Sequence, residues 1–201
     1  MMPSDAAARE RIENTKNATQ AKNRICAYAL LEVAYFDIFS QPMPPLSFDS
    51  RGGKPFLCDG KIKISISHTD DLCAVAFSES DVGVDVQSYS EMLGREGALK
   101  RFVNEDLQNA LKMQKTAEVE YLFYEIKDSN IVRIFSDKND FFDTKLSPTD
   151  TKAAGEWSRL EAVLKCGCGF GDYKNARALA AATSAQTRFL STAALSVAVA
   201  E

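Results

Sequence analysis

The chain has 201 residues, of which 45% are hydrophobic and 26% charged, as is typical of a globular protein that buries its own core. Its net charge of −4 argues against nucleic-acid binding, which usually requires a strongly basic surface. The sequence has no apolar run of about 18 residues and no signal-peptide core, so we expect a cytoplasmic protein that does not enter a membrane.

The five cysteines indicate a reducing compartment, because their number is odd and their spacing matches no disulfide framework. Cys166 and Cys168 are separated by a single glycine, which raises the possibility of a metal site. A structural zinc site needs four ligands, and no second Cys or His cluster supplies the others. The sequence therefore disfavours structural zinc.

Helices and strands are predicted to alternate irregularly along the chain. We expect helix over 5–38, a stop at the prolines between 41 and 45, and a short strand at 55–58. Further strands are expected at 63–67, 72–77 and 82–86, helix over 90–115, and a hairpin at 121–126 and 131–135. A polar loop over 136–150, a helix over 152–165 and one or two closing strands between 188 and 200 complete the chain.

This irregular order favours an α+β fold over a doubly wound sheet. A change from strands to the second helical region lies between 83 and 90. We therefore expect an N-terminal lobe of residues 1–86 and a C-terminal lobe of residues 87–201 that act as one functional unit. Two lobes in one chain favour a monomer.

Cations and hydroxyls gather in the first half of the sequence. Lys54 lies between two glycines and Pro55, which suits a turn whose backbone can approach a ligand closely. Ser67 and His68 follow a predicted strand, and hydroxyl and imidazole groups can both donate to phosphate oxygens. Taken singly, the Lys54 motif indicates an ordinary turn, and a lone histidine such as His68 is more often a surface or packed residue.

Carboxylates occur in two later motifs. Asp85 follows Gly83 at the predicted end of a strand, and it could simply begin a turn there. Trp157, Glu161 and Lys165 are spaced by four residues and share one helix face. That spacing alone is also consistent with a solvent-exposed Glu–Lys pair beside a core tryptophan. If Asp85 and Glu161 converge, they offer the carboxylates that Mg²⁺ prefers beside substrate phosphates.

The order of these motifs resembles the 4′-phosphopantetheinyl transferases, in particular the two-lobed type that activates peptide and polyketide synthetases. The matching motifs are Gly-Lys54-Pro55, Ser67-His68-Thr69, Gly-Val-Asp85, Arg101-Phe102 and Trp157-x-x-x-Glu161-Ala-x-x-Lys165, between about residues 24 and 170. The resemblance implies two similar α+β lobes related by a pseudo-twofold axis, with coenzyme A between them. It also implies Mg²⁺-dependent transfer of the phosphopantetheine arm to a serine of an acyl or peptidyl carrier protein, which releases adenosine 3′,5′-bisphosphate.

The resemblance also implies roles for individual residues. Lys54, Pro55, Ser67 and His68 match positions that contact the coenzyme, and Arg24 is similar to an arginine that holds its 3′-phosphate. Asp85 and Glu161 match magnesium ligands, with Gln87 as a weak third, and Glu161 also matches the base that takes the serine proton. Lys165 matches a lysine that steadies the transferred phosphoryl group, and Lys100 to Phe102 match a carrier-docking segment.

The sequence departs from the family pattern at two chemically important positions. Gln87 stands where many relatives have a third acid, and Leu160 stands where relatives usually have a lysine. These departures leave two alternatives open. One is a homologue that binds coenzyme A and a partner protein without catalysis, and the other is an α+β domain that matches by chance.

Overall fold

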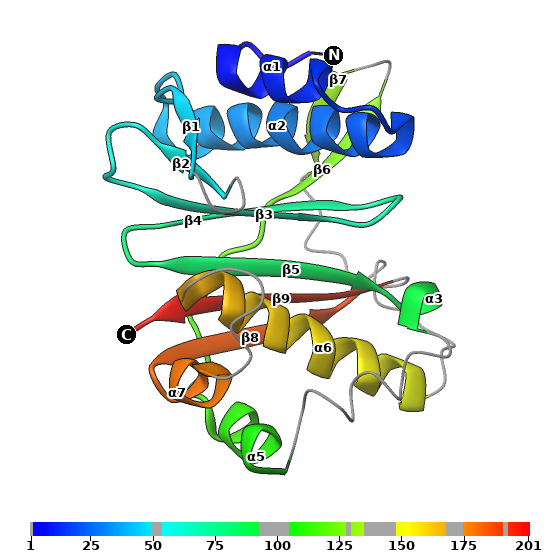
Figure 1. Cartoon of the computed structure of the whole chain (residues 1–201), viewed down its shortest axis with the longest axis vertical. Helices are drawn as coiled ribbons and strands as arrows, with labels where there is room; N and C mark the ends of the chain where they lie inside the picture. Colours follow the sequence, from blue (N-terminus) through cyan, green and yellow to red (C-terminus); the bar gives the residue numbers. More distant parts are fainter. Residues whose placement is uncertain are drawn as a thin grey trace.

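The computed structural model describes residues 2–49, 54–92, 105–127, 130–134, 148–167, 175–190 and 193–201. It has an α+β architecture in which helices pack on small antiparallel sheets, so the predicted fold class is confirmed. Strands β3 and β4 cross the middle of the molecule, next to β5, and helices lie above and below these strands (Figure 1). The predicted boundary between residues 86 and 87 falls inside β5 (Val82–Ser88).

The N-terminal half consists of helices α1 (Ala6–Glu13) and α2 (Ala18–Phe39) and two pairs of antiparallel strands. One pair is β1 (Leu46–Phe48) with β2 (Pro55–Leu57), and the other is β3 (Lys63–His68) with β4 (Cys73–Ser78). Tyr35 and Leu31 of α2 are fully buried against these strands. The predictions for β2, β3 and β4 are confirmed to within a residue or two, whereas β1 was not predicted.

The long N-terminal helix that we expected is two helices. Asn17 adopts an extended backbone conformation and its side chain accepts a hydrogen bond from the backbone N–H of Gln20, so α2 begins after it. An asparagine at this position satisfies an amide that the helix leaves without a partner. Asp5 caps α1 in the same way, by accepting from Ala8. The periodicity of the apolar residues did not reveal the break because local side-chain capping causes it.

The C-terminal half is built around a three-stranded antiparallel sheet in the order β5–β9–β8. Here β8 is Thr183–Phe189 and β9 is Ala193–Ala200, so a closing strand is confirmed by β9, whereas β8 begins five residues before the predicted range of 188–200. Helix α6 (Pro148–Gly167) crosses one face of this sheet (Figure 1). The predicted loop over 136–150 is wrong at its end, because α6 begins at Pro148, where a proline fits the first helical turn.

Three short helices and a hairpin complete the described structure. The expected helix over 90–115 is represented by α3 (Tyr89–Met92) and α5 (Glu105–Met113), and residues 93–104 lie outside the described ranges. Helix α7 (Ala176–Ala181) was not predicted. The predicted hairpin is confirmed as β6 (Phe123–Lys127) with β7 (Asn130–Ile134), and it reaches α2 through a hydrogen bond from Tyr124 to Asp37.

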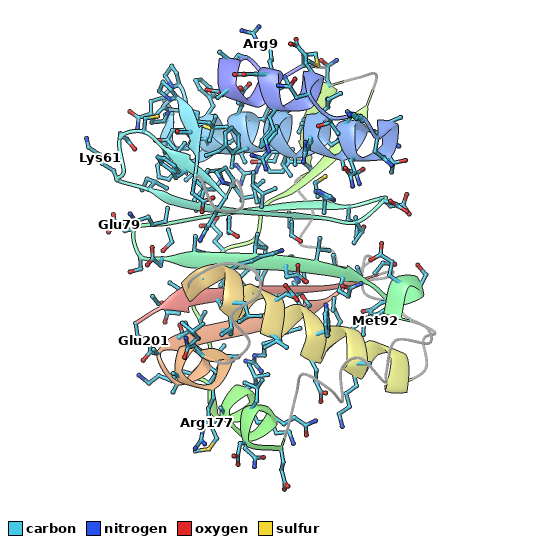
Figure 2. The ribbon with its side chains drawn as sticks, in the orientation of Figure 1. Arg9, Lys61, Glu79, Met92, Arg177 and Glu201 are labelled. Atoms are coloured by element: carbon cyan, nitrogen blue, oxygen red, sulfur yellow. The ribbon has the colours of Figure 1, made fainter. Side chains whose placement is uncertain are left out.

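Side chains at the margins point outward from connecting segments. Lys61 and Glu79 project from the turns that precede β3 and β5, and Arg9 and Arg177 lie at opposite ends of the molecule (Figure 2).

Among the helices that the structure describes, none is both long enough and apolar enough to cross a bilayer. The expected carrier-docking segment at Lys100 to Phe102 and the residue Cys168 lie outside the described part of the chain.

Candidate functional site

Helix α6 packs directly against the backbone of β5 at Gly83. A Cβ atom on Gly83 would lie 1.9 Å from the carbonyl oxygen of Ala162 and 2.5 Å from the backbone nitrogen of Cys166. Only glycine therefore allows the helix to lie this close to the strand. Side chains at alternate positions of a strand share a face, so Asp85 and Gln87 follow Gly83 on the face directed at α6.

Asp85 is the centre of a buried polar group. Its carboxylate oxygen Oδ1 lies 2.7 Å from the ammonium of Lys165 and accepts a hydrogen bond of 2.9 Å from Ser67. Its backbone carbonyl accepts a hydrogen bond of 2.9 Å from Ser158. We had expected Asp85 at the end of a strand, but β5 continues to Ser88, so Asp85 lies inside the strand with only 6% of its surface exposed.

Glu161 belongs to the same interface. It lies three residues after Ser158 and four before Lys165, and both of these residues bond to Asp85. Residues at these spacings share a helix face, so Glu161 is on the side of α6 that faces β5. Glu161 and Lys165 are 5% and 7% exposed, which contradicts the alternative of a solvent-exposed Glu–Lys pair.

Ser67 connects the two halves of the molecule at this point. Its hydroxyl donates to Asp85 and accepts from the backbone amide of Val86 at 3.2 Å and from Lys165 at 3.1 Å. A hydroxyl has one donor and two acceptor positions, so Ser67 uses all of them within the protein. Ser65 accepts from Val84 in the same manner, and the two contacts place β3 alongside β5 in the parallel sense.

His68 follows Ser67 at the exposed end of β3. Its Nδ1 atom lies 3.4 Å from the side-chain nitrogen of Asn23. Loss of solvent around the ring lowers the pKa of His68 below 6.5, and the positive charges of Lys165 and Arg24 lower it further. The positive charges of Lys165 and Arg24 thus act on the ring of His68, and the carboxylate of Asp70 opposes them.

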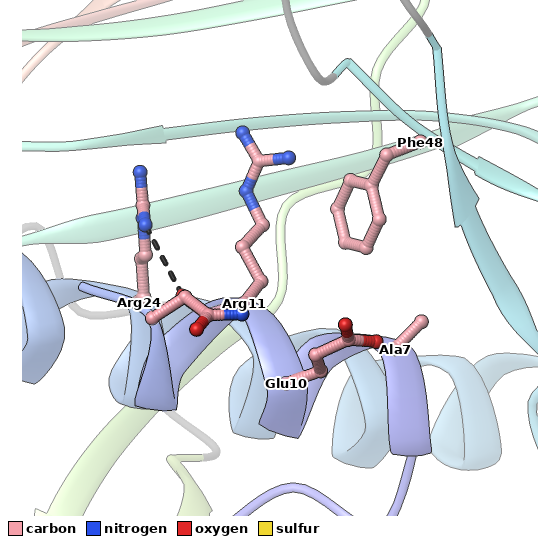
Figure 3. A pocket seen from close by; sticks show the side chains of 6 residues that line it. Ala7, Glu10, Arg11, Arg24 and Phe48 are labelled. Atoms are coloured by element: carbon pink, nitrogen blue, oxygen red, sulfur yellow. Dashed lines mark hydrogen bonds between the residues drawn. The ribbon is translucent and has the colours of Figure 1, made fainter.

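Arg24 projects from α2 toward α1. Its guanidinium donates to the hydroxyl of Thr15 and, at 3.3 Å, to the carbonyl of Arg11. The side chains of Arg24 and Arg11 extend in the same direction, and the guanidinium of Arg11 lies 4.5 Å from the ring centre of Phe48 (Figure 3). These residues line a hollow of about 340 Å³ together with Ala7, Glu10 and Asn14. Paired guanidinium groups beside an aromatic ring can hold a phosphate or a planar ligand.

Lys54 contacts the backbone of Lys165. The ammonium of Lys54 donates a hydrogen bond of 2.6 Å to the backbone carbonyl of Lys165, close to the C-terminus of α6. A cation there satisfies a helix carbonyl and interacts favourably with the helix dipole. Lys54 and Pro55 also line a hollow of about 270 Å³ beside Asp81 and Val82. Lys54 therefore links the N-terminal half to the end of α6.

The side chain of Gln87 is directed toward the start of α3. Its side-chain nitrogen donates one hydrogen bond of 2.9 Å to the Oε2 atom of Glu91 and another of 3.5 Å to the carbonyl of Ser88.

At Leu160, where the family resemblance predicts a lysine, the side chain is fully buried in the C-terminal core. The neighbouring Arg159 does not replace that lysine, because its guanidinium donates a hydrogen bond of 3.1 Å to the carbonyl of Ala185 in β8.

The side chains of Asp85, Glu161 and Gln87 carry oxygen atoms, the ligand type that Mg²⁺ prefers. Among the described residues, Asp85 Oδ2 is a buried oxygen that accepts no hydrogen bond. Burial raises the pKa of Asp85, whereas the charge of Lys165 and the hydrogen bonds from Lys165 and Ser67 act in the opposite direction. A cation beside Oδ2 would supply the missing stabilisation, with Asp85, Glu161 and the amide oxygen of Gln87 as its oxygen ligands. Three or more acidic, His or Cys side chains do not cluster as a ready metal site in the described ranges.

Sequence reasoning missed four residues of this site: Asn23, Ser65, Glu91 and Ser158. Ser158 could have been found, because it lies three residues before Glu161 on the same helix face. Ser65 shares a strand face with Ser67, so alternation in β3 also pointed to it. Asn23 and Glu91 gave no signal, because their contacts join separate elements.

No protein-family model matches this sequence, and it matches no curated protein.

Proposed function

We propose that the protein is a Mg²⁺-dependent 4′-phosphopantetheinyl transferase with two similar lobes, which uses coenzyme A and an acyl or peptidyl carrier protein. The observation that carries the proposal is the convergence of Asp85, Glu161 and Lys165 on one buried interface. These residues come from motifs about seventy residues apart in the sequence, and chance matches to short motifs would have no reason to meet.

The chemistry follows from the charges on the two sides of the site. His68, Lys165 and Arg24 favour the anionic coenzyme, and the hollow beside Arg11 and Arg24 suits a phosphate with an attached ring. The carboxylates of Asp85 and Glu161, with the Gln87 amide, would hold Mg²⁺. When bound, the ion neutralises charge on the pyrophosphate of coenzyme A and aligns the leaving group.

Transfer requires a new bond between the carrier serine oxygen and the β-phosphorus of coenzyme A. The bond from that phosphorus to the bridging oxygen breaks, and adenosine 3′,5′-bisphosphate leaves with the electron pair. Glu161 takes the serine proton and passes it to solvent. Lys165 stabilises the phosphoryl oxygens through its ammonium, a contribution that is often the largest in such reactions.

The direct test is mass spectrometry of an apo carrier panel after incubation with the purified chain, coenzyme A and Mg²⁺. We expect the carrier to gain the phosphopantetheine mass, and Asp85→Ala and Glu161→Ala to abolish the gain at a temperature where circular dichroism shows that both variants are still folded. Glu79→Ala is the matched control, because Glu79 is an exposed acid in the turn before β5. Unchanged transfer in both site variants would contradict the proposal.

A second candidate is a homologue that binds coenzyme A and a partner protein but does not transfer the arm. It is favoured by the buried Leu160 and by the engagement of Arg159 with Ala185, which leave the site one cation short of the family pattern. This candidate predicts coenzyme A binding by calorimetry with no mass gain on any carrier. A transferase gives both signals, and a chance match gives neither.

A further inference from the structure

Glu91 lies next to the proposed cation site without having been assigned to it. It is a half-exposed residue of α3, directly after β5, and its carboxylate accepts the hydrogen bond from the side-chain nitrogen of Gln87 at 2.9 Å. Gln87 itself is only 9% exposed. Glu91 therefore reaches back from the first turn after the strand to hold a buried amide.

This hydrogen bond fixes the direction of the Gln87 amide. An ionised carboxylate can only accept hydrogen bonds, so the amide must present its nitrogen to Glu91 and direct its oxygen elsewhere. Gln87 and Asp85 are two residues apart in β5 and share the strand face that is directed at α6. The Gln87 side chain therefore lies on the same side of β5 as Asp85, and its oxygen is not the atom that Glu91 engages.

The carboxylate of Glu91 also makes the amide oxygen of Gln87 a stronger metal ligand. A hydrogen bond from the amide nitrogen to a negative group increases the electron density on the amide oxygen, as outer carboxylates do for metal-bound histidines. Lys165 cancels one of the two carboxylate charges that Asp85 and Glu161 bring. Glu91 adds a negative charge directly behind the Gln87 amide.

We propose that Glu91 is a positioning residue of the divalent-cation site: it orients the Gln87 amide oxygen toward the ion and supplies the negative charge that Gln87 lacks. The inference rests on the proposed function for the cation site itself. A second observation that points to a ligand is the buried Asp85 Oδ2, which accepts no hydrogen bond from the described residues. Glu91 thus compensates for the departure at Gln87.

The test measures cation binding by the full chain without coenzyme A or carrier. Mn²⁺ is titrated and the free ion is followed by electron paramagnetic resonance, and Mg²⁺ binding is measured by competition. Glu91→Gln keeps the size of the side chain and removes its charge, and we expect it to weaken binding at least about tenfold. The double variant Gln87→Glu with Glu91→Gln returns an acid to the strand and should recover most of the affinity.

Glu105→Gln is the matched control, because Glu105 is an exposed acid in the first turn of α5. It should bind Mn²⁺ as the unmodified protein does. If Glu91→Gln also binds as the unmodified protein does, the role of Glu91 is wrong while the cation site stands. If the unmodified protein binds no cation, the proposed site and this inference fall together.

A second measurement covers the case in which Glu91→Gln does not fold. In the unmodified protein, the side-chain amide signal of Gln87 in nitrogen-edited NMR should shift when Mg²⁺ is added. Gln87→Leu identifies that signal by its loss. An amide signal that does not move at saturating Mg²⁺ would overturn the inference, because the oxygen would then not be a ligand.

Discussion

The ammonium of Lys165 lies 2.7 Å from the carboxylate of Asp85, and both side chains are 9% exposed. The contact joins the last turns of α6 to the middle of β5, and Ser67 of β3 bonds to both groups. Three segments that are far apart in the sequence therefore meet at one buried charge pair. Because buried charges are costly when they lose their partner, this pair controls both stability and the proposed chemistry.

Removing either member of the pair should destabilise the protein strongly. We expect Asp85→Asn and Lys165→Met each to lower the free energy of unfolding by about 3 kcal/mol or more, because each leaves a buried group without its partner. The double variant should cost clearly less than the sum of the two, since no unpaired charge remains. Urea unfolding of the four proteins measures this coupling, and strictly additive effects would contradict the pair.

Because the chain has one histidine, the ring signals of His68 can be assigned directly, and they report on the charges at the end of β3. Its imidazole should titrate below 6.5 in NMR, owing to partial loss of solvent and the charges of Lys165 and Arg24. Arg24→Gln should raise this pKa toward 6.5, and added inorganic phosphate should raise it further if the anion binds nearby. A titration at or above 6.5 in the unmodified protein would contradict the arrangement.

The same shift makes stability depend on pH in a defined direction. The unfolded chain binds the His68 proton more readily than the folded chain, so stability from this group falls as pH falls through 6.5 and below. Above that range neither state is protonated, and the group contributes nothing. Thermal unfolding should therefore show less loss below pH 6.5 in His68→Gln than in the unmodified protein.

Lys54 should stabilise the C-terminus of α6. Lys54→Met removes the donor to the Lys165 carbonyl and should lower the free energy of unfolding by about 1–2 kcal/mol, whereas Lys54→Arg keeps a cationic donor and should lose less. If Lys54 also contacts coenzyme phosphates, Lys54→Ala should weaken coenzyme affinity more than maximal rate. Urea unfolding and coenzyme titration separate the two roles, and unchanged stability in Lys54→Met would contradict the cap.

Gly83 should be the least tolerant of the described glycines. Gly83→Ala would place a methyl group against backbone atoms of α6, which cannot rotate away, so we expect a loss of about 3 kcal/mol or more. Gly60→Ala is the matched control, because Gly60 has a positive φ of 66° and nothing within 4 Å of an added Cβ. It should cost only about 1 kcal/mol through backbone strain. Equal losses measured by thermal unfolding would contradict the close packing.

The sequence was most informative where a pattern is local. Alternation identified β3, the turn at Asp70 and Asp71 identified the start of β4, and the apolar run before the end of the chain identified β9. The break between α1 and α2, the early start of α6 and the short helix α7 were missed, because capping and packing decide them more than periodicity does. A short apolar strand such as β1 carries too few residues for a period to be visible.

By itself, the sequence determined which chemical groups are available and that Trp157, Glu161 and Lys165 share a helix face, since helix geometry fixes that spacing. It could not determine that Lys165 turns to Asp85, that Lys54 caps α6, or that Glu91 holds Gln87. Those contacts join separate elements, and their partners are selected by how α6 packs on β5 at Gly83. Spacing along a chain specifies a face, whereas only three-dimensional packing specifies what that face meets.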